Sequence, residues 1–410
     1  MKDLHNGNLY WPTTLSNNCS YPPLQLNARY RVAIVGGGIS GLLCGYVLAK
    51  SGINTVILER GEVAGGSTSA NTGLLQFCND IMLTDLIEEI GEADAVQFYK
   101  ACQKAVEQFG EIVDELNIGD GFARRSSLYY ASTEEEVPKL KREYETLLAN
   151  GFPVEYWEPD TIERHFPFRK PGAIVTHGDA EINPLLFVHA LAEASTSLGL
   201  VIYEHTDITT HDTQDFGLHR LTAATGAVIE ADHVIYAIGY EPEELRGQLI
   251  KADINRTYAI VTEPQRDIAP WHEQYLIWES ARPYIYMRTT GDGRVIVGGL
   301  DENNSEPLHN DQQRHARTDK LLQQLQNLFP AFTAPIAYDW TASFGESRDN
   351  LPFIGKDPAW PGVYYCLGYG GNGSVYSMIA SCLLRDLIRG DDHQLAHIVK
   401  LDRTTQLNRV

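Results

Sequence analysis

The sequence lacks the cysteine pairs and the long apolar runs that mark disulfide-rich or membrane-spanning chains. Its six cysteines include no CxxC pair, and no apolar stretch approaches the ~18 residues of a spanning helix. The first 29 residues are polar and contain no apolar core of the kind that a secretory signal needs. From these absences we expect reduced thiols, no membrane span and a cytoplasmic location.

Patterns for metal binding are also scarce. His393 and His397 stand four residues apart, which would place them on one face of a helix. No HExxH motif and no cysteine cluster supplies further ligands. We therefore interpret the pair as solvated and predict no metal site.

Basic residues are fewer than acidic ones. Lys and Arg total 33 against 54 for Asp and Glu, which gives a formal net charge of −21. Such a chain repels nucleic acid and anionic membranes, so we expect neither as a partner. The negative field would favour a cationic substrate, although solubility alone also accounts for an excess of acid.

A nucleotide-binding pattern stands near the start of the chain. The apolar run 31–35 suits a buried parallel strand and leads into a GxGxxG motif at 36–41, which opens a helical pattern. A second strand, 55–58, ends at Glu59, 18 residues after Gly41. The glycines permit a tight turn and a close pyrophosphate, and Glu59 would bind a ribose diol. The motif alone does not choose between FAD and NAD.

A second glycine-rich turn repeats this spacing near the other end of the chain. Residues 368–373 read GYGGNG, between the apolar run 363–367 and the helical pattern 374–389. No further strand with an acidic residue follows, so this is not a second complete dinucleotide unit. A helix N-terminus here would stabilise an anion such as the pyrimidine edge of a reduced flavin, and a plain packing turn is the alternative.

The rest of the chain alternates between helical and strand patterns. Helices are expected at 84–116, 134–150, 183–198 and 311–328, and strands at 200–203 and 233–237. Between about 246 and 336, alternating apolar and polar stretches predict an antiparallel sheet.

Four segments, in this order, resemble the D-amino-acid oxidase-like superfamily of flavoproteins. They read VAIVGGGISGL with VILER, GGSTSANTGLL, ADHVIYAIG, and WTASFGESRDNLPFIG with YCLGYGGNGSVYS. The resemblance runs from about Tyr10 to Arg389, and the preamble with YWP and YPPL is similar to γ-glutamylputrescine oxidase-like members; glycine oxidase-like members also resemble this chain. It implies an FAD-dependent oxidoreductase in which hydride passes from the carbon beside a neutral amine to flavin N5, and the imine is then hydrolysed.

The expected fold is of the α/β class, with a Rossmann-like FAD-binding domain and an inserted α+β substrate domain built on an antiparallel sheet. We assign residues 30–85, 150–245 and 337–400 to the FAD-binding domain and residues 86–149 and 246–336 to the substrate domain. Residues 1–29 form an N-terminal extension.

The resemblance also implies which residues hold the cofactor. They are Gly36, Gly38, Ile39, Ser40, Gly41, Glu59, Arg60, Gly66, Ser67, Thr68, Asn71, Thr72, Gly73, Leu74, Asp207, Ile208, Ala237, Gly239, Gly345, Gly370, Gly371, Asn372, Gly373 and Ser374. Relatives that attach the flavin covalently use a His or a Cys at the positions of Ala70 and Ala342. We therefore expect non-covalent FAD.

The basic residues that hold a substrate carboxylate in some relatives are missing. The matching positions are Phe344 and Val375, and burying an α-carboxylate without a cation is costly. Unless Arg288 or Arg348 substitutes, this argues against a simple α-amino acid and favours an amine. A lysine that speeds the reaction with oxygen in some relatives aligns with Ile296, so the electron acceptor is open.

The candidates for the substrate pocket are aromatic: Tyr258, Tyr286, Phe344 and Tyr369. Their ring faces would attract a cationic amine, although Tyr258 and Tyr286 are equally consistent with packing in a sheet. Three functions stay open: oxidation of a small amine, such as a polyamine derivative or a secondary amine; dehydrogenation of a 2-hydroxy acid or a polyol phosphate; and non-catalytic flavin binding. The second requires a cationic pocket and a base.

Overall fold

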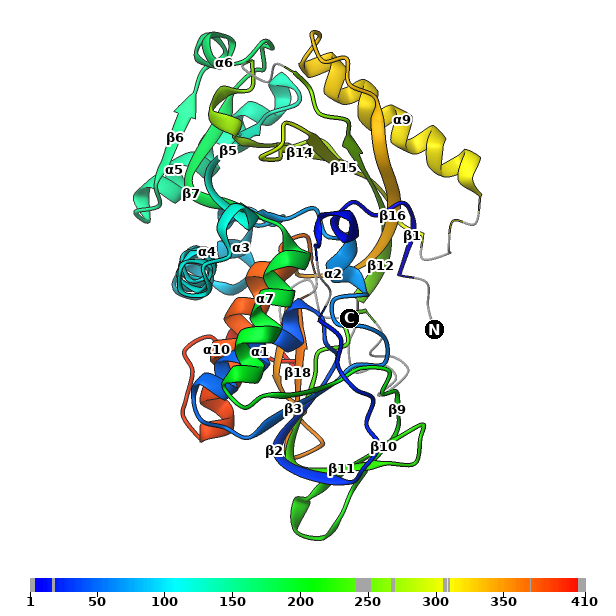
Figure 1. Cartoon of the computed structure of the whole chain (residues 1–410). Helices are drawn as coiled ribbons and strands as arrows, with labels where there is room; N and C mark the ends of the chain where they lie inside the picture. The colour runs from blue at the N-terminus through cyan, green and yellow to red at the C-terminus, as the bar shows by residue number, and fades with distance from the viewer. Residues whose placement is uncertain are drawn as a thin grey trace.

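The computed structural model describes residues 4–16, 19–240, 252–266, 270–304, 308, 310–368 and 370–404. Tyr369, one of the aromatic candidates, lies outside the described residues. The ribbon has two lobes, each organised around one sheet (Figure 1).

The lower lobe of Figure 1 is organised around parallel strands, in the order β18-β11-β2-β3-β8. Their bounds are Val363–Leu367, Val228–Tyr236, Ala28–Val35, Thr55–Leu58 and Val201–Tyr203. β17 (Phe353–Lys356) pairs antiparallel with β18 at one edge. The apolar runs form these strands because both faces of the sheet are covered.

Helices and a ribbon of strands cover this sheet. Helices α1 (Ile39–Lys50), α7 (Pro184–Ser197) and α10 (Gly373–Arg389) lie together in Figure 1. The side chain of Asn183 accepts a hydrogen bond from the backbone of Leu186, so α7 begins where the sequence predicts. Strands β9 (Ile208–Thr213) and β10 (His219–Ala223) extend β11 as an antiparallel ribbon.

The upper lobe holds the larger sheet, in the order β1-β16-β12-β15-β14-β13-β5-β7-β4, with β6 also paired to β7. Their bounds are His5–Gly7, Ile336–Ser347, Ala252–Thr262, Val295–Glu302, Ile285–Thr289, Leu276–Glu279, Phe122–Tyr130, Ala173–Ile182, Leu74–Leu75 and Val154–Trp157. The sheet is mixed, because β13 runs parallel to β5. Within 246–336, the strands β12, β15, β14 and β13 pair antiparallel, as the sequence predicts.

Helix α9 (Asp311–Leu328) packs on the larger sheet, with bounds that agree with the sequence pattern. The pattern at 84–116 forms two helices, α3 (Leu83–Ile90) and α4 (Glu92–Leu116). The expected single helix is wrong because Gly91 adopts a φ of 88°, which glycine reaches without strain and which ends α3. Helices α5 (Val137–Ala149) and α6 (Pro159–His165) complete the upper lobe.

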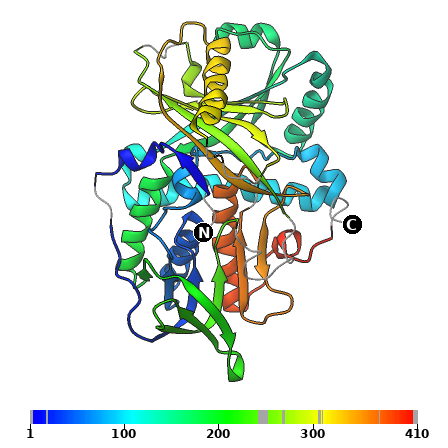
Figure 2. The ribbon, with the colours of Figure 1, turned by 90° about the vertical axis from the view of Figure 1, so that its right-hand side faces the viewer.

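The sheets place several segments differently from the expected domain boundaries. β6, α6 and β7 belong to the upper lobe, although we assigned 150–245 to the FAD-binding domain. β16 also pairs with β12 and not with the parallel sheet. The extension contributes one short strand to the larger sheet, because β1 pairs with β16, with His5 opposite Ala342. Figure 2 shows this first strand between the lobes. Pairing partners of this kind are distant in the sequence, so local patterns do not reveal them.

One hydrophobic core joins the two lobes. Phe98 of α4 packs against Tyr376 of α10, with ring centroids 5.7 Å apart, and both belong to the same buried cluster. Within the described part of the chain, no helix has the length and apolar character to cross a membrane. The same residues include no group of three or more His, Cys, Asp or Glu side chains placed to hold a metal, and His397 instead lies 3.1 Å from Asp94 at the surface.

Candidate active site

The two glycine-rich turns line one cavity of about 1080 Å³, although they stand near opposite ends of the chain. The side-chain oxygens of Ser40 in α1 and Ser377 in α10 lie 2.7 Å apart, which joins the first turns of the two helices. The cavity also has walls from the loop 65–74 and from the larger sheet. The spacing motifs therefore identify two parts of the same site.

Glycine is required at two positions of the first turn for different reasons. Gly36 has a φ of 109°, and a Cβ there would lie 2.3 Å from the carbonyl oxygen of Ala237. A Cβ at Gly41 would lie 1.9 Å from the carbonyl oxygen of Gly36, so α1 packs directly on the turn. This packing holds the N-terminus of α1 at the cavity, where its amide groups favour an anion.

The carboxylate of Glu59 is fixed at the end of β3. It accepts hydrogen bonds from the backbone of Gly37 at 2.6 Å and of Gly61 at 2.7 Å. Glu59 also lines the cavity, beside Arg60. The sequence places this acid correctly beside the first turn, and its contact with a ribose stays a prediction.

Three side chains from other segments donate hydrogen bonds to carbonyl groups of the loop 65–74. The indole nitrogen of Trp340 donates to the carbonyl of Ala70 at 3.0 Å, and that of Trp11 donates to the carbonyl of Asn71. Arg288 donates to the carbonyl of Thr72 at 2.8 Å. The sequence pattern did not reveal Trp11, because the contact joins the extension to a loop 60 residues away.

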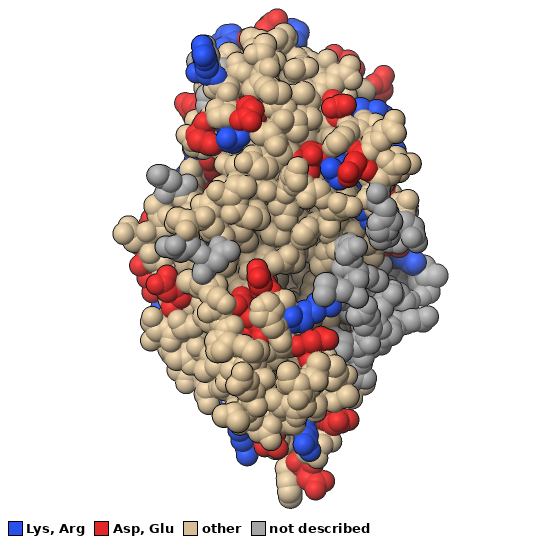
Figure 3. All heavy atoms as spheres, turned by 45° about the vertical axis from the view of Figure 1, so that its right-hand side comes forward, with Lys and Arg blue, Asp and Glu red and all other residues tan. Residues whose placement is uncertain are grey.

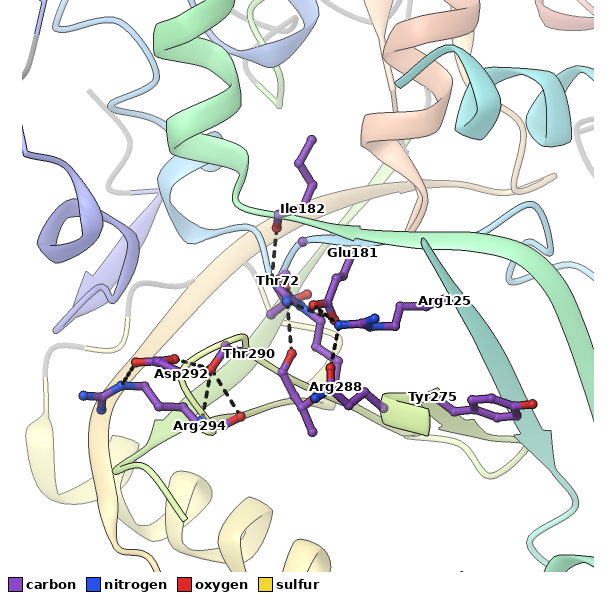
Figure 4. Close-up of polar contacts among 12 residues, drawn as sticks. Thr72, Arg125, Glu181, Ile182, Tyr275, Arg288, Thr290, Asp292 and Arg294 are labelled. Carbon is purple, nitrogen blue, oxygen red and sulfur yellow. Dashed lines mark hydrogen bonds and ion pairs between the residues drawn. The ribbon is translucent and has the colours of Figure 1, made fainter. Parts of the chain in front are cut away.

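Arg288 lies in a buried cluster beneath this loop (Figure 4). It also donates to the carbonyl of Ile182 at 3.0 Å and lies 3.5 Å from the carboxylate of Glu181, which pairs with Arg125 at 2.9 Å. Burial lowers the pKa of the Arg288 guanidinium. Arg288 does not line the cavity, and Arg348 is exposed and does not line it either. Neither arginine therefore takes the place of the basic residues that hold a substrate carboxylate in some relatives.

The second turn is tied to residues that the sequence motifs did not identify. Gly370 donates its backbone N–H to the carbonyl of Gly345 at 2.8 Å, and Gly371 donates to the carboxylate of Asp80 at 2.8 Å. The amide of Asn372 donates to Asn79 at 2.9 Å. Asn79 and Asp80 follow the loop 65–74 and belong to no motif of their own, so only the fold brings them to the turn.

Nearly all of the predicted cofactor residues line the cavity. The exceptions are Gly41, Gly73 and Gly345, which lie behind its wall and pack against backbone. The hydroxyl of Ser67 is buried and has no hydrogen-bond partner in the described structure, although Ser67 lines the cavity. An unsatisfied donor in the predicted cofactor loop fits a bound polar ligand there.

The end of the cavity beside the second turn has aromatic walls, from Trp278, Tyr284, Tyr286 and Phe344. Trp278 is stacked on Tyr129 with ring centroids 3.8 Å apart, which fixes one wall. Burial raises the pKa of the Tyr286 hydroxyl well above its usual range, so this phenol stays neutral. Sequence reasoning found Tyr286 and Phe344 but missed Trp278 and Tyr284.

Tyr258 does not line this cavity. It belongs to the separate core cluster beneath α9, and its hydroxyl donates to Glu302 at 2.8 Å. Its neighbour Thr257 lines the cavity, and successive residues of a strand point to opposite faces. Tyr258 therefore points away from the cavity, and its prediction as a residue of the substrate pocket is wrong.

Carboxyl groups lie at the same end of the cavity. The pKa of Asp301 is raised to about 6, chiefly by burial and also by the charge of Asp80, against the opposing effects of a hydrogen bond from Thr257 and of the charge of Arg282. Glu346 does not line the cavity but is influenced by these groups, because burial raises its pKa to about 7 together with the charges of Asp80 and Asp301. Among the described lining residues, only His5 and Arg60 have basic side chains. His5 contacts the carbonyl of Gly65 at 3.3 Å, and Arg60 follows Glu59, so both belong to the nucleotide side.

The fold and a cavity lined by two glycine-rich turns define a flavin-dependent oxidoreductase. The family model described as FAD dependent oxidoreductase matches residues 31–387, so the chain belongs to that family and FAD is its cofactor. The chain is 25% identical over 380 residues to a glycine oxidase of Geobacillus kaustophilus, covering 88% of this chain and 93% of that protein. It is 24% identical over 400 residues to the γ-glutamylputrescine oxidoreductase of Escherichia coli, covering 93% and 89%. The crystal structure of the G. kaustophilus glycine oxidase superposes with a TM-score of 0.78 at 22% identity and covers 92% of this chain and 99% of that one.

We predict that acid precipitation of the purified protein releases all of its flavin into the supernatant. Ala70 and Ala342 line the cavity and offer no nucleophile, whereas burial keeps the pKa of the Cys78 thiol well above its usual value. The absorbance of supernatant and pellet measures the split. Yellow colour retained in the pellet would identify a covalent bond, and Cys78→Ser would then test the one thiol among the described lining residues.

Proposed function

We propose that this enzyme oxidises the C–N bond of a small cationic amine that has no carboxylate on the reacting carbon. One observation carries the proposal: the end of the cavity beside the second turn combines aromatic rings with carboxyl groups, and none of its described lining residues is Lys, Arg or His. Aromatic faces and carboxylates attract a cation, whereas an α-carboxylate would be buried without a partner.

We further propose how the chain holds its cofactor. The first turn and Glu59 would bind the adenosine and the pyrophosphate, the loop at 66–74 would contact the ribityl chain, and the turn at 370–374 would face the ring. Trp11, Trp340 and Arg288 fix that loop by their hydrogen bonds to its carbonyls.

The cofactor, when bound, supplies the acceptor for the hydride. The residues of the chain orient the amine and exclude water from it: Trp278, Tyr284 and Tyr286 form the walls, and Tyr286 is held by hydrogen bonds with Thr72 and Thr257. Because the phenol of Tyr286 stays neutral, it is a positioning group and not a base. The released imine is hydrolysed in water.

The relatives agree with chemistry at a C–N bond. A glycine oxidase and a γ-glutamylputrescine oxidoreductase, by their names, act on an amino acid and on an acylated diamine. The absence of a basic clamp favours a substrate of the second type or a simple amine. A 2-hydroxy acid or a polyol phosphate is anionic and would face Asp80 and Asp301, so the cavity offers no observation in favour of that alternative.

Anaerobic mixing with candidate substrates tests the proposal. We expect α,ω-diamines, acylated diamines or N-alkyl amines to bleach the flavin band near neutral pH or above, because the reacting nitrogen must be neutral. Glycine, larger α-amino acids, 2-hydroxyglutarate and glycerol 3-phosphate serve as matched comparisons. Bleaching by a hydroxy acid and by no amine would reject the proposal, and bound flavin that no compound reduces would favour non-catalytic flavin binding.

A further inference from the structure

Asp301 has a place in the cavity that the binding of FAD and the transfer of hydride do not explain. It stands near the end of β15, after Gly298, Gly299 and Leu300, and lines the cavity. Its Oδ1 atom is buried and has no hydrogen-bond partner in the described structure. A buried carboxylate oxygen without a donor is costly, so this atom is suited to a donor brought by a ligand.

Other groups around Asp301 define the charge of that ligand. The charges of Asp80 and Asp301 act on each other, on Glu346 and on the phenols of Tyr284 and Tyr286. Arg282 opposes them from an exposed position, where its guanidinium stacks over Tyr284 at 4.7 Å and does not line the cavity. Figure 3 shows a hollow near the middle of the face drawn there, with acidic side chains and a basic side chain at its rim. The surroundings of the unpaired oxygen therefore favour a cation.

This cation cannot be the nitrogen that reacts. Carboxylates beside an amine stabilise its protonated form, whereas loss of hydride from the neighbouring carbon requires the neutral form. The carboxyl groups therefore suit a second nitrogen, one that stays protonated during turnover. Aromatic walls add attraction for the same charge and for the carbon chain that links two nitrogens.

Resting on the function proposed above, we propose that Asp301 anchors a second, non-reacting ammonium group, so that the preferred substrates are diamines or polyamines with a free distal amine. Asp301 is in this view a residue that determines specificity, because its carboxylate selects the far end of the substrate. Asp80 has its own backbone partner in Gly371, at 2.8 Å, and contributes through its charge.

The test compares α,ω-diaminoalkanes with alkylamines of the same chain length, in the flavin-loaded full chain. The wild-type enzyme is expected to have a higher kcat/KM for the diamine, since a hydrogen bond to a charged group changes affinity by about 10- to 100-fold. Asp301→Asn should remove this preference, mainly through a higher KM for the diamine. Asp319→Asn, on the exposed side of α9, is the matched control and should retain the preference.

A second variant keeps the test decisive if the neutral one is hard to interpret. Asp301→Lys should reject diamines and accept ω-amino acids, whose far end is a carboxylate. Flavin content and melting temperature identify a variant that has lost its fold. A wild-type enzyme that prefers the alkylamine or the ω-amino acid, or an Asp301→Asn enzyme that keeps its preference for the diamine, overturns the inference.

Failure of the proposed function is distinguished by the same titrations. If no amine reduces the flavin, amine oxidation is rejected. Binding of the diamine, read from the shift of flavin absorbance, then decides the role of Asp301 by itself. An equal shift in wild type and Asp301→Asn shows that this carboxylate anchors no ammonium group.

Discussion

Gly41→Val is expected to remove most of the affinity for FAD. The Cβ of any residue at this position would lie 1.9 Å from the carbonyl oxygen of Gly36, a contact that backbone cannot relieve without moving α1 away from β2. The amides of the first turn of α1 would move with it. Losing one or two hydrogen bonds to a charged phosphate costs ~1.5–3 kcal/mol each, so we expect affinity to fall by about 10- to 10⁴-fold.

Fluorescence quenching of added FAD by the apoprotein measures this loss. Gly291→Ala is the matched control, because a Cβ there meets no atom within 4 Å and its φ is not positive. Far-UV circular dichroism shows whether the variant keeps its fold, and Gly41→Ala is a milder form of the same clash. Wild-type affinity in Gly41→Val would show that the first turn is not the phosphate site.

The parts of the fold that local patterns determine were predictable. The strand and helix that flank Gly36–Gly41 follow from an apolar run and a glycine spacing, and α9 and β18 have the bounds that the sequence indicates. The two turns share a cavity, as a single bound flavin requires. In each case, residues close in the sequence determine the outcome.

The parts that depend on distant pairing were not predictable. Asp80 belongs to no motif, and the YWP preamble gives no sign of the partner of Trp11. Both residues reach the site only because β1 pairs with β16 and because the segment after β4 crosses to the second turn. Tyr258 was predicted on the wrong face of its strand. A sequence indicates the face of a residue only when the two faces of the strand differ in polarity. Residues on the two faces of β12 are both buried, so that contrast is absent.

Arg288→Met is expected to destabilise the protein strongly and to loosen the flavin loop. The side chain is only 3% exposed and holds the carbonyls of Thr72 and Ile182 besides its contact with Glu181 (Figure 4). Removing one member of a buried charge pair costs ~3–5 kcal/mol, because the remaining charge is left without full compensation. Arg169→Met, at an exposed ion pair with Asp160 and Glu163, is the control and should change stability by less than ~1 kcal/mol.

A double variant separates the two roles of Arg288. Glu181→Gln in the Arg288→Met background removes the charge that faced Arg288, while its amide oxygen can still accept from Arg125, so part of the lost stability should return in urea unfolding. The affinity for FAD should not return, because the carbonyl of Thr72 still lacks its donor. If FAD affinity recovers together with stability, Arg288 acts only through the charge of the core. If affinity stays low while stability recovers, the guanidinium positions the loop that faces the cofactor. Arg288 is buried away from the cavity, which explains why it cannot also bind a substrate carboxylate.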